Sequence, residues 1–303
     1  MLIIREAIPD DAADIARIHI SDIENKSVIS KIPYTPDSYY PLGGQWMHED
    51  TCREHIIQFT SLGGRIFVAE LDGKVVGEID VIIEDDPLPY GRYLYIYVLM
   101  VHKNFRGQGI GRRLIEYAEK YAENTSASSI CTFIELNSEP FYRKLGFILS
   151  EKWTTIEVFS EMAEIQFDYQ EVDAEYFRKS LLEKKYQIVF GRYGGNRSLL
   201  YNMTAKYSSL KELKIEYTFF RVKYSNSELL YAIRYSNTIS NAVYCWSSEQ
   251  RNIDIFEAMR TAKILAAHTN IGSFITCVKN KYSEIIKKIV EPVDWYKKTL
   301  KSK

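Results

Sequence analysis

A long apolar stretch runs from Tyr93 to Val101 and is apolar at both odd and even positions, with many β-branched and aromatic residues. A strand that is covered on both faces has this pattern. From Ile110 to Ala122 the apolar residues instead recur at helical spacing, which predicts an amphipathic helix. The run Arg106-Gly107-Gln108-Gly109-Ile110-Gly111 joins the two. The sequence therefore predicts a strand that turns into a helix across three glycines.

The same patterns divide the rest of the first half into strands and helices. They predict strands at residues 2–7 and 129–136, a hairpin over 65–83 that turns at Asp72-Gly73, helices at 9–19, 49–62 and 139–145, and a loop at 22–45. In the helix at 49–62 we expect Ile56, Ile57 and Phe59 to face inward. The hairpin makes the sheet antiparallel at this point.

The second half alternates strands and helices as well, but without a glycine loop. It predicts strands at 165–172, 187–192, 273–278 and 295–300, a hairpin of 212–225 with 229–235, and helices at 174–184, 253–268 and 283–290. A chain of 303 residues is long for one core, so two domains are expected. We assign residues 1–160 and 161–303 to them.

The glycine loop has the chemistry of an anion site. Glycines let the backbone approach a ligand closely, and the free N–H groups of a first helical turn attract an anion such as a pyrophosphate. Arg106 and Arg112 add positive charge beside it. The alternative is a plain turn in which the glycines serve only the bend. If the loop binds a pyrophosphate, a side chain at Gly109 or Gly111 should collide with it.

Two motifs in this order resemble those of the GNAT superfamily of N-acetyltransferases. Arg106-x-x-Gly109-x-Gly111, after Leu99-Met100-Val101-His102, resembles the acyl-CoA pyrophosphate loop, and Phe141-Tyr142-Arg143-Lys144-Leu145-Gly146-Phe147 resembles the second signature. A dinucleotide fingerprint is the main competitor, but its third glycine would fall at Leu114. A P-loop is excluded because no Gly-Lys-Ser/Thr follows. The resemblance covers about residues 1–158.

The resemblance implies an α+β fold with a mixed α/β sheet, splayed between its fourth and fifth strands to admit the pantetheine arm of acetyl-CoA. It assigns these residues to the cofactor: Leu99, Met100, Val101, Arg106, Gly107, Gln108, Gly109, Ile110, Gly111, Arg112, Asn137 and Tyr142. It implies transfer of an acetyl group to a primary amine of a small molecule or peptide, by direct attack in a ternary complex. A catalytically silent acyl-CoA-binding sensor is the alternative.

Acetyl transfer needs a hydrogen-bond donor near the departing thiolate and a base for the amine. Tyr142 matches the family's tyrosine on the thiolate side. The family's usual base is missing, since Tyr95 and Tyr97 occupy the strand face where many members carry a glutamate. The candidates on neighbouring strands, which would act through a water, are Glu78, Glu135 and Asp80.

The acceptor side is predicted from aromatic residues. The loop at 22–45 contains prolines and tyrosines, and it suits either a lid over the acceptor or a packed surface loop. An aromatic pocket of Tyr34, Trp46 and Tyr97 suits a small amine or a peptide N-terminus, whereas a polyamine or aminoglycoside site should show a denser acidic cluster.

The second half is either a degenerate GNAT-like domain or another α+β domain. Neither motif recurs in it, so we do not expect it to bind acyl-CoA in the same manner. Residues 1–160 alone should still bind acetyl-CoA, since both motifs lie there, but should be less soluble and lose acceptor turnover.

Composition narrows the partners and the compartment. With 39 Lys+Arg against 40 Asp+Glu, no strong field exists to attract nucleic acid or an anionic membrane. No apolar run approaches the length of about 18 residues that a membrane helix needs, which predicts a soluble cytoplasmic protein, a monomer or homodimer. Cys52, Cys131, Cys245 and Cys277 lack ligand spacing, so we expect buried thiols and no metal site.

Overall fold

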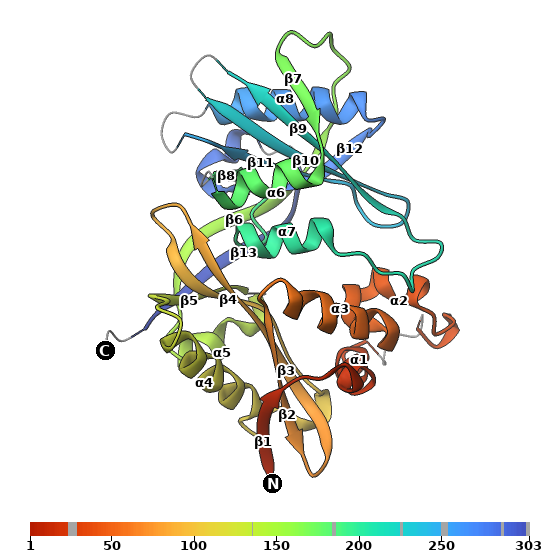
Figure 1. The fold of residues 1–303 in the computed structure, drawn as a ribbon, viewed down its shortest axis with the longest axis vertical. Helices are drawn as coiled ribbons and strands as arrows, with labels where there is room; N and C mark the ends of the chain where they lie inside the picture. Colours follow the sequence, from red (N-terminus) through yellow and green to blue (C-terminus); the bar gives the residue numbers. More distant parts are fainter. Residues whose placement is uncertain are drawn as a thin grey trace.

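The computed structural model describes residues 1–23, 29–134, 136–183, 186–224, 227–249, 254–285 and 288–300. Its strands join in one mixed sheet that continues from the first half of the chain into the second, with helices packed on its faces (Figure 1). One apolar core cluster contains buried residues of both halves, among them Phe59 and Trp246. None of the described helices is long and apolar enough to cross a membrane.

The first half follows the predicted order of elements. It holds β1 (Leu2–Glu6), α1 (Ala12–Ile20), α2 (Pro36–Gly43), η3 (Gly44–Met47), α3 (Glu49–Ser61), β2 (Arg65–Leu71), β3 (Lys74–Asp86), β4 (Gly91–Val101), α4 (Ile110–Glu123), β5 (Ser129–Ile134), α5 (Glu139–Lys144) and β6 (Ile148–Phe159). The hairpin of β2 and β3 turns at Asp72 and Gly73, which both have positive φ, as a two-residue turn of this kind requires.

Two predictions for this half are wrong in part. The segment at 22–45, predicted as a loop, contains α2, which begins at Pro36 and is capped by the Thr35 side chain; residues 24–28 lie outside the described residues. In α3, Ile57 does not face inward but is 53% exposed, and His55 is buried in the core instead. The buried face of α3 is therefore rotated about the helix axis relative to the predicted one.

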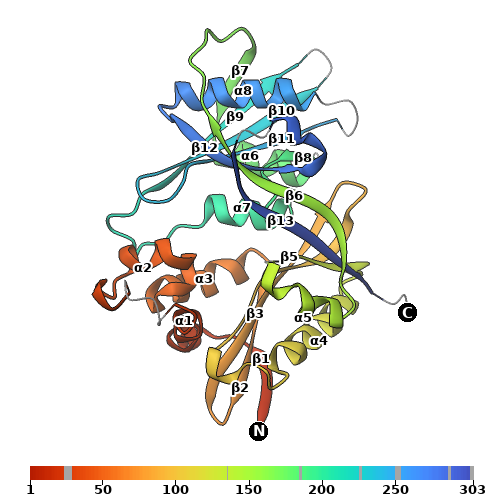
Figure 2. The same cartoon turned by 180° about the vertical axis from the view of Figure 1, so that it is seen from behind.

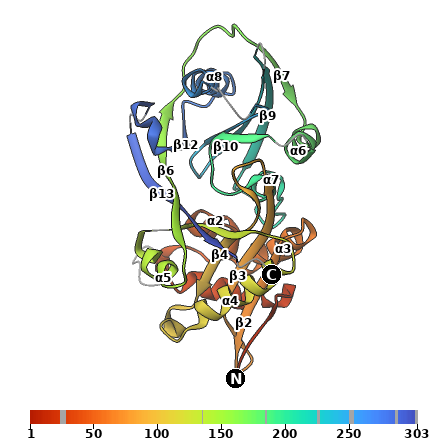
Figure 3. The same ribbon diagram turned by 90° about the vertical axis from the view of Figure 1, so that its left-hand side faces the viewer.

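The second half contains more elements than the sequence predicted. It holds β7 (Asp168–Val172), α6 (Ala174–Glu183), β8 (Gln187–Phe190), α7 (Asn196–Thr204), β9 (Ile215–Lys223), β10 (Glu228–Ser236), β11 (Ala242–Ser247), α8 (Ile255–His268), β12 (Ser273–Lys279) and β13 (Lys288–Thr299). Figure 3 shows α6 and α8 on opposite sides of these strands. The sequence prediction lacked α7 and β11. The predicted helix at 283–290 is wrong at its end, because β13 begins at Lys288 and pairs with β6.

Two long strands, β6 and β13, connect the sheets of the two halves. The sheet order is β1-β2-β3-β4-β5-β13-β6-β12-β11-β10-β9-β7, with β8 paired to β11. The end of β13 lies on β5, where Trp295 faces Phe133, and the end of β6 lies on β12, where Phe159 faces Ser273. Figure 2 shows β6 and β13 running together from one half into the other. Each half therefore completes the sheet of the other.

In the first half, β4 and β5 are parallel and diverge along their length. Their described pairs are at Leu94 and Tyr95 of β4, whereas β4 continues to Val101. Tyr97 lies at a β-bulge, since it is skipped in the register between β3 and β4. We call the space between the diverging strands the first wedge. The splay that the resemblance implied between the fourth and fifth strands is thus present.

In the second half, β11 and β12 form the matching parallel pair, which is joined at Ala242 and Ile275. Strand β8 lies in this second wedge and pairs antiparallel with β11. Directly after β8, Gly191 donates its backbone N–H to the Cys277 carbonyl oxygen of β12, with an N···O distance of 2.7 Å. The chain's own strand therefore fills the second wedge.

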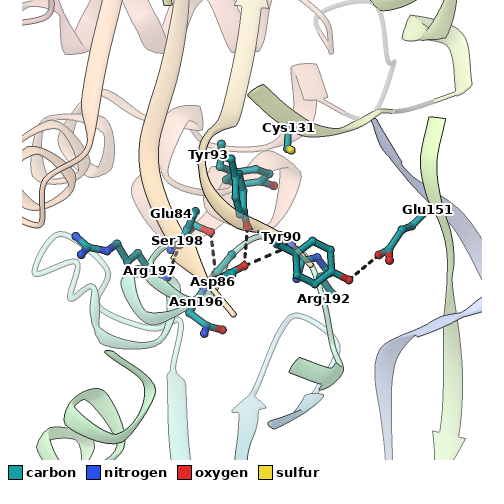
Figure 4. A network of polar contacts seen from close by, with 12 residues as sticks. Glu84, Asp86, Tyr90, Tyr93, Cys131, Glu151, Arg192, Asn196, Arg197 and Ser198 are labelled. Atoms are coloured by element: carbon teal, nitrogen blue, oxygen red, sulfur yellow. Dashed lines mark hydrogen bonds and ion pairs between the residues drawn. The ribbon is translucent and has the colours of Figure 1, made fainter. Parts of the chain in front are cut away.

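A polar seam joins β3 to α7. One face of β3 carries four buried acids: Glu78, Asp80, Glu84 and Asp86. Glu84 accepts the backbone N–H groups of Arg197 and Ser198, both at 2.8 Å, and Asp86 accepts that of Asn196 at 3.1 Å (Figure 4). The first turn of a helix has N–H groups without helical partners. Acids of the first half thus cap a helix of the second.

Candidate functional site

The glycine loop between β4 and α4 is exposed and open. Gly107 and Gly109 have φ values of 77° and 80°, which glycine adopts at little cost. A Cβ at either position would meet nothing within 4 Å. Gly109 caps α4 without a side-chain hydrogen bond, Gln108 is exposed and Ile110 is buried beneath the loop. The N–H groups of the first helical turn are therefore accessible to an anion.

Gly111 has a different surrounding from the one we predicted. A Cβ there would lie 3.3 Å from Phe141 Cζ and 3.7 Å from Val101 Cγ2. A side chain at Gly111 would first press on Phe141 of α5, so its effect would not report on a bound pyrophosphate. The expected collision applies to Gly109 and, on the same grounds, to Gly107.

Both arginines of the loop have acidic partners. Arg106 donates from Nε to the Val101 carbonyl oxygen at 2.8 Å, and its Nη2 lies 2.5 Å from Asp22 Oδ1. Arg112 lies 2.7 Å from Glu116, one turn further along α4. These exposed ion pairs contribute little stability, so an arriving anion can replace the acid at small cost.

The remaining predicted cofactor residues lie around the first wedge. Residues 99–101 belong to the part of β4 beyond its described pairs with β5. Tyr142 is buried on α5 between Phe141 and Phe147, with ring centroids 5.1 and 5.3 Å away. Asn137 is exposed in the turn before α5. Glu135 lies outside the described residues, so its proposed role as a base stays a prediction.

Two buried carboxyl groups on β3 each face a histidine. Glu78 hydrogen-bonds His19 Nε2 of α1. Asp80 Oδ2 accepts from His55 Nε2 of α3 at 2.8 Å and from Trp46 Nε1 at 3.0 Å. The second oxygen of each carboxyl, Glu78 Oε2 and Asp80 Oδ1, is buried without a partner among the described residues.

Burial acts on the first of these carboxyl–histidine pairs. Removal from water, together with the neighbouring Asp80, raises the pKa of Glu78 well above its usual value, and burial lowers the pKa of His19 to about 4. Burial therefore favours the neutral forms of both Glu78 and His19. With Nε2–H directed at Asp80, His55 has Nδ1 available as an acceptor.

A chain of hydrogen bonds leads from Asp80 into the second half. His55 Nδ1 accepts from the Tyr201 hydroxyl of α7 at 2.5 Å, and the Tyr201 and Tyr207 hydroxyl oxygens lie 2.9 Å apart. Burial raises the pKa of both tyrosines, so both hydroxyls stay protonated. We call Asp80, His55, Tyr201 and Tyr207 the relay.

Trp46 and Tyr97, two of the three aromatic residues predicted for the acceptor, lie together. Their ring centroids are 5.4 Å apart, and Trp46 also stacks on His19 at 5.5 Å. The Tyr97 hydroxyl donates to Asn202 Oδ1 and accepts from Gln45 Nε2 at 3.3 Å. The bulged residue of β4 is thus held by one side chain from each half.

Tyr34, the third predicted aromatic residue, lies apart. Its ring packs edge-on against Tyr39 at 4.8 Å and lies 4.4 Å from His48, with its side chain 48% exposed. In the part of the chain that the structure describes, no ring contact links it to Trp46 or Tyr97. The structure therefore does not bring Tyr34 into the cluster.

A cavity of about 610 Å³ lies between the two halves beside this cluster. Its wall is formed by α2, η3, α7 and the segment after it, and by β9, β10 and β11. Gln45 and Asn202, which hold the Tyr97 hydroxyl, both line it, as does Tyr207 at the end of the relay. We call it the interface cavity.

Sequence reasoning missed most of the relay. His55 lies three and four residues from Cys52 and Phe59 on the buried face of α3, a helical spacing that marks it as buried. The acids at every second position of β3 had a similar signal, since alternation on a strand places them on one face. Tyr201 carries no local signal, because its partner His55 comes from the other half of the chain, and Tyr207 joins the relay only through Tyr201.

Comparisons with known proteins agree with this geometry. Residues 63–149 match the family model described as an acetyltransferase (GNAT) domain. Human N-acetyltransferase 8B is 32% identical over 88 residues, which are 28% of this chain and 39% of that protein, so the chain spans less than half of this relative. The family match lies within the first half.

Solved structures resemble the chain over both halves. A GCN5-related N-acetyltransferase from Kribbella flavida matches 99% of this chain and 71% of its own with a TM-score of 0.62 at 10% identity. One from Anabaena variabilis matches 99% and 73% with a TM-score of 0.60 at 9% identity. At this identity the likeness concerns the fold alone.

Proposed function

We propose that the protein is an N-acetyltransferase that transfers an acetyl group from acetyl-CoA to a primary amine of a small molecule or peptide. The proposal starts from the match of residues 63–149 to the GNAT acetyltransferase domain. The observation that carries the proposal is the divergence of β4 from β5 beside the exposed glycine loop and the N-terminus of α4. A wedge beside an anion site suits a ligand that has a narrow arm and a pyrophosphate.

The residues that would hold acetyl-CoA are 99–101 on β4, Gly107 and Gly109 in the loop, and the first turn of α4. Acetyl-CoA bound there supplies the acetyl thioester. Tyr142 on α5 would donate a hydrogen bond on the thiolate side. Tyr142→Phe should then lower kcat more than it raises KM, because this bond strengthens only as charge develops.

For the amine proton we propose the relay. As the Tyr207 hydroxyl accepts this proton, it donates its own to Tyr201, which donates to His55 Nδ1. The resulting imidazolium is stabilised by the Asp80 carboxylate at 2.8 Å. Glu78 is a weaker candidate for the base than Asp80, since burial raises its pKa and favours its protonated form, and since it is directed at His19.

Release of the free thiol of CoA, measured with acetyl-CoA and a panel of small amines and peptides, tests the activity. We expect turnover with at least one amine. Binding of acetyl-CoA without thiol release for the whole panel would leave the silent sensor as the function, and absence of acetyl-CoA binding would contradict both.

His55→Gln tests the relay. It should lower kcat about 10²- to 10⁴-fold, as the loss of a proton acceptor does, and leave acetyl-CoA affinity unchanged. His268→Gln on α8 is the matched control, since it removes a histidine far from the relay in the sheet order. Equal kcat values for the two variants would remove the relay from the mechanism.

The reducing cytoplasm remains our proposed compartment. All four cysteines are buried thiols, which fits a compartment in which thiols stay reduced. The oligomeric state, monomer or homodimer, stays a prediction.

A further inference from the structure

The interface cavity is lined by two cations and by no acid. Lys206 is exposed at its edge, whereas Arg234 of β10 is half-buried within it. None of the described lining residues is an aspartate or glutamate. The side chains that line the cavity therefore carry more positive than negative charge.

Arg234 has donors without a carboxylate partner. Its Nη2 donates to the Ser240 carbonyl oxygen at 2.7 Å, its guanidinium hydrogen-bonds the Tyr217 side chain, and its Nε is buried without a partner among the described residues. The fully buried Arg192, whose Nε also lacks a partner, lies 3.5 Å from Asp86 Oδ2. Among the described residues, the structure gives Arg234 no such ion pair, so a ligand that brings an anionic acceptor would supply it.

Tyrosines surround the Arg234 guanidinium in place of acids. Tyr40, Tyr217 and Tyr244 line the cavity with it. A hydroxyl is both a donor and an acceptor, so these side chains offer polar contacts to the guanidinium. The guanidinium is thus held in position and keeps its charge.

We propose that the acceptor carries an anionic group besides its amine, and that Arg234 binds this group in the interface cavity. The inference rests on the proposed function. A guanidinium presents paired N–H donors that match a carboxylate or a phosphate. Since Gln45 and Tyr207 line the same cavity, an acceptor whose anionic end meets Arg234 can direct its amine toward Tyr97 and the relay. A polycationic amine is repelled.

The test measures binding, so it needs no turnover. Two pairs of probes differ only in the anionic group: alanyl-tyrosine against its C-terminal amide, and O-phosphoethanolamine against ethanolamine. Each is titrated into the full chain by calorimetry. The anionic member of at least one pair should bind about tenfold or more tightly, which is what a hydrogen bond to a charged group contributes. The pair that shows the difference distinguishes a carboxylate from a phosphate.

Variants of Arg234 link the preference to this side chain. Arg234→Gln should reduce the affinity ratio to about one, and Arg178→Gln, which removes the same charge from the exposed face of α6, should keep the parent ratio. Arg234→Lys retains the charge without the planar fork and should lose part of the ratio, which gives a second measurement if the glutamine variant does not fold.

A ratio near one for both pairs in the parent protein, or a ratio that survives both Arg234 substitutions, would overturn the inference. Acetyl-CoA binding is measured on the same samples. Failure of the parent to bind acetyl-CoA contradicts the proposed function, whereas normal acetyl-CoA binding without an anion preference contradicts only the role of Arg234.

Discussion

The two wedges of this molecule have the same strand topology but differ in what lies between their strands. In each half a parallel pair of strands, β4 with β5 and β11 with β12, is joined at one end and then diverges. The first wedge leads to an exposed loop. The second is occupied by β8, which pairs with β11, and Gly191 directly after it bonds to β12. A shared fold therefore does not give a shared site, because a strand of the chain can occupy the place of a ligand.

The helices that follow the two wedges differ in whether a side chain caps their N-terminus. Helix α4 begins at Gly109 without a capping side chain. Helix α8 begins after Asp254, whose carboxylate accepts the N–H groups of Phe256 and Glu257 at 2.9 and 3.3 Å. The partial positive charge of a helix N-terminus is thus available in the first half and satisfied within the chain in the second.

The largest expected effect comes from separating the halves. Residues 1–160 lack β13, which lies between β5 and β6, so this fragment should aggregate rather than bind acetyl-CoA as the sequence alone suggested. Co-expression with residues 161–303 should restore a soluble complex that binds acetyl-CoA. Gel filtration and calorimetry of both preparations check this; a soluble, binding-competent fragment alone would show that β13 is dispensable to the first wedge.

The next effect concerns the strand that fills the second wedge. Gly191 has a φ of 85°, and a Cβ there would lie 2.8 Å from Tyr244 Cδ1 and 2.9 Å from Tyr244 Cα. Gly191→Ala should lower the free energy of unfolding by about 3 kcal/mol, from backbone strain and overpacking together. Acetyl-CoA affinity should not change. Gly63→Ala, with a φ of 90° and open space, should show the strain alone in the same denaturant titration.

A smaller effect is expected in the first wedge. Gly109→Ala should weaken acetyl-CoA binding about tenfold, or about 1.4 kcal/mol, because its methyl group takes the open space beside the loop. Gly73→Ala is the matched control, since Gly73 also has a φ of 80° and open surroundings, yet it lies in the β2–β3 turn. Calorimetry that finds the same affinity for both variants would remove the loop from the cofactor site.

The last effect is a slope with pH and concerns the seam between the halves. Burial, with Asp86 nearby, raises the pKa of Glu84 to about 7. A carboxyl with a raised pKa binds its proton more tightly in the folded state, so its contribution is complete below the unfolded pKa of about 4.5 and is lost as pH rises through 7. The unfolding free energy of the parent relative to Glu84→Gln should fall by about 1.4 kcal/mol for each pH unit within this window.

Denaturant titrations at several pH values measure this difference. Glu123→Gln, which removes an exposed carboxyl from α4, should show no such slope relative to the parent. A constant difference between the parent and Glu84→Gln would mean that Glu84 keeps its charge throughout.

The parts that could be predicted from sequence are local ones. The strand ending at Val101, the glycine loop and α4 follow from periodicity and glycine positions within one segment. The second wedge was not predictable in this way: the strand near 187–192 was correctly expected, but its place against β11 depends on pairing with residues more than 50 positions away. The relay was missed for the same reason, since it needs α3 and α7 from opposite halves.

The position of β13 between β5 and β6 has a consequence for synthesis of the chain. A ribosome completes every element of the first wedge by Phe159, yet the strand that covers the edge of β5 ends at Thr299. Through most of translation the nascent first half therefore exposes an unpaired strand edge, which is prone to pair with the wrong chain. A stop before β13 would thus disable a site whose own residues had all been made.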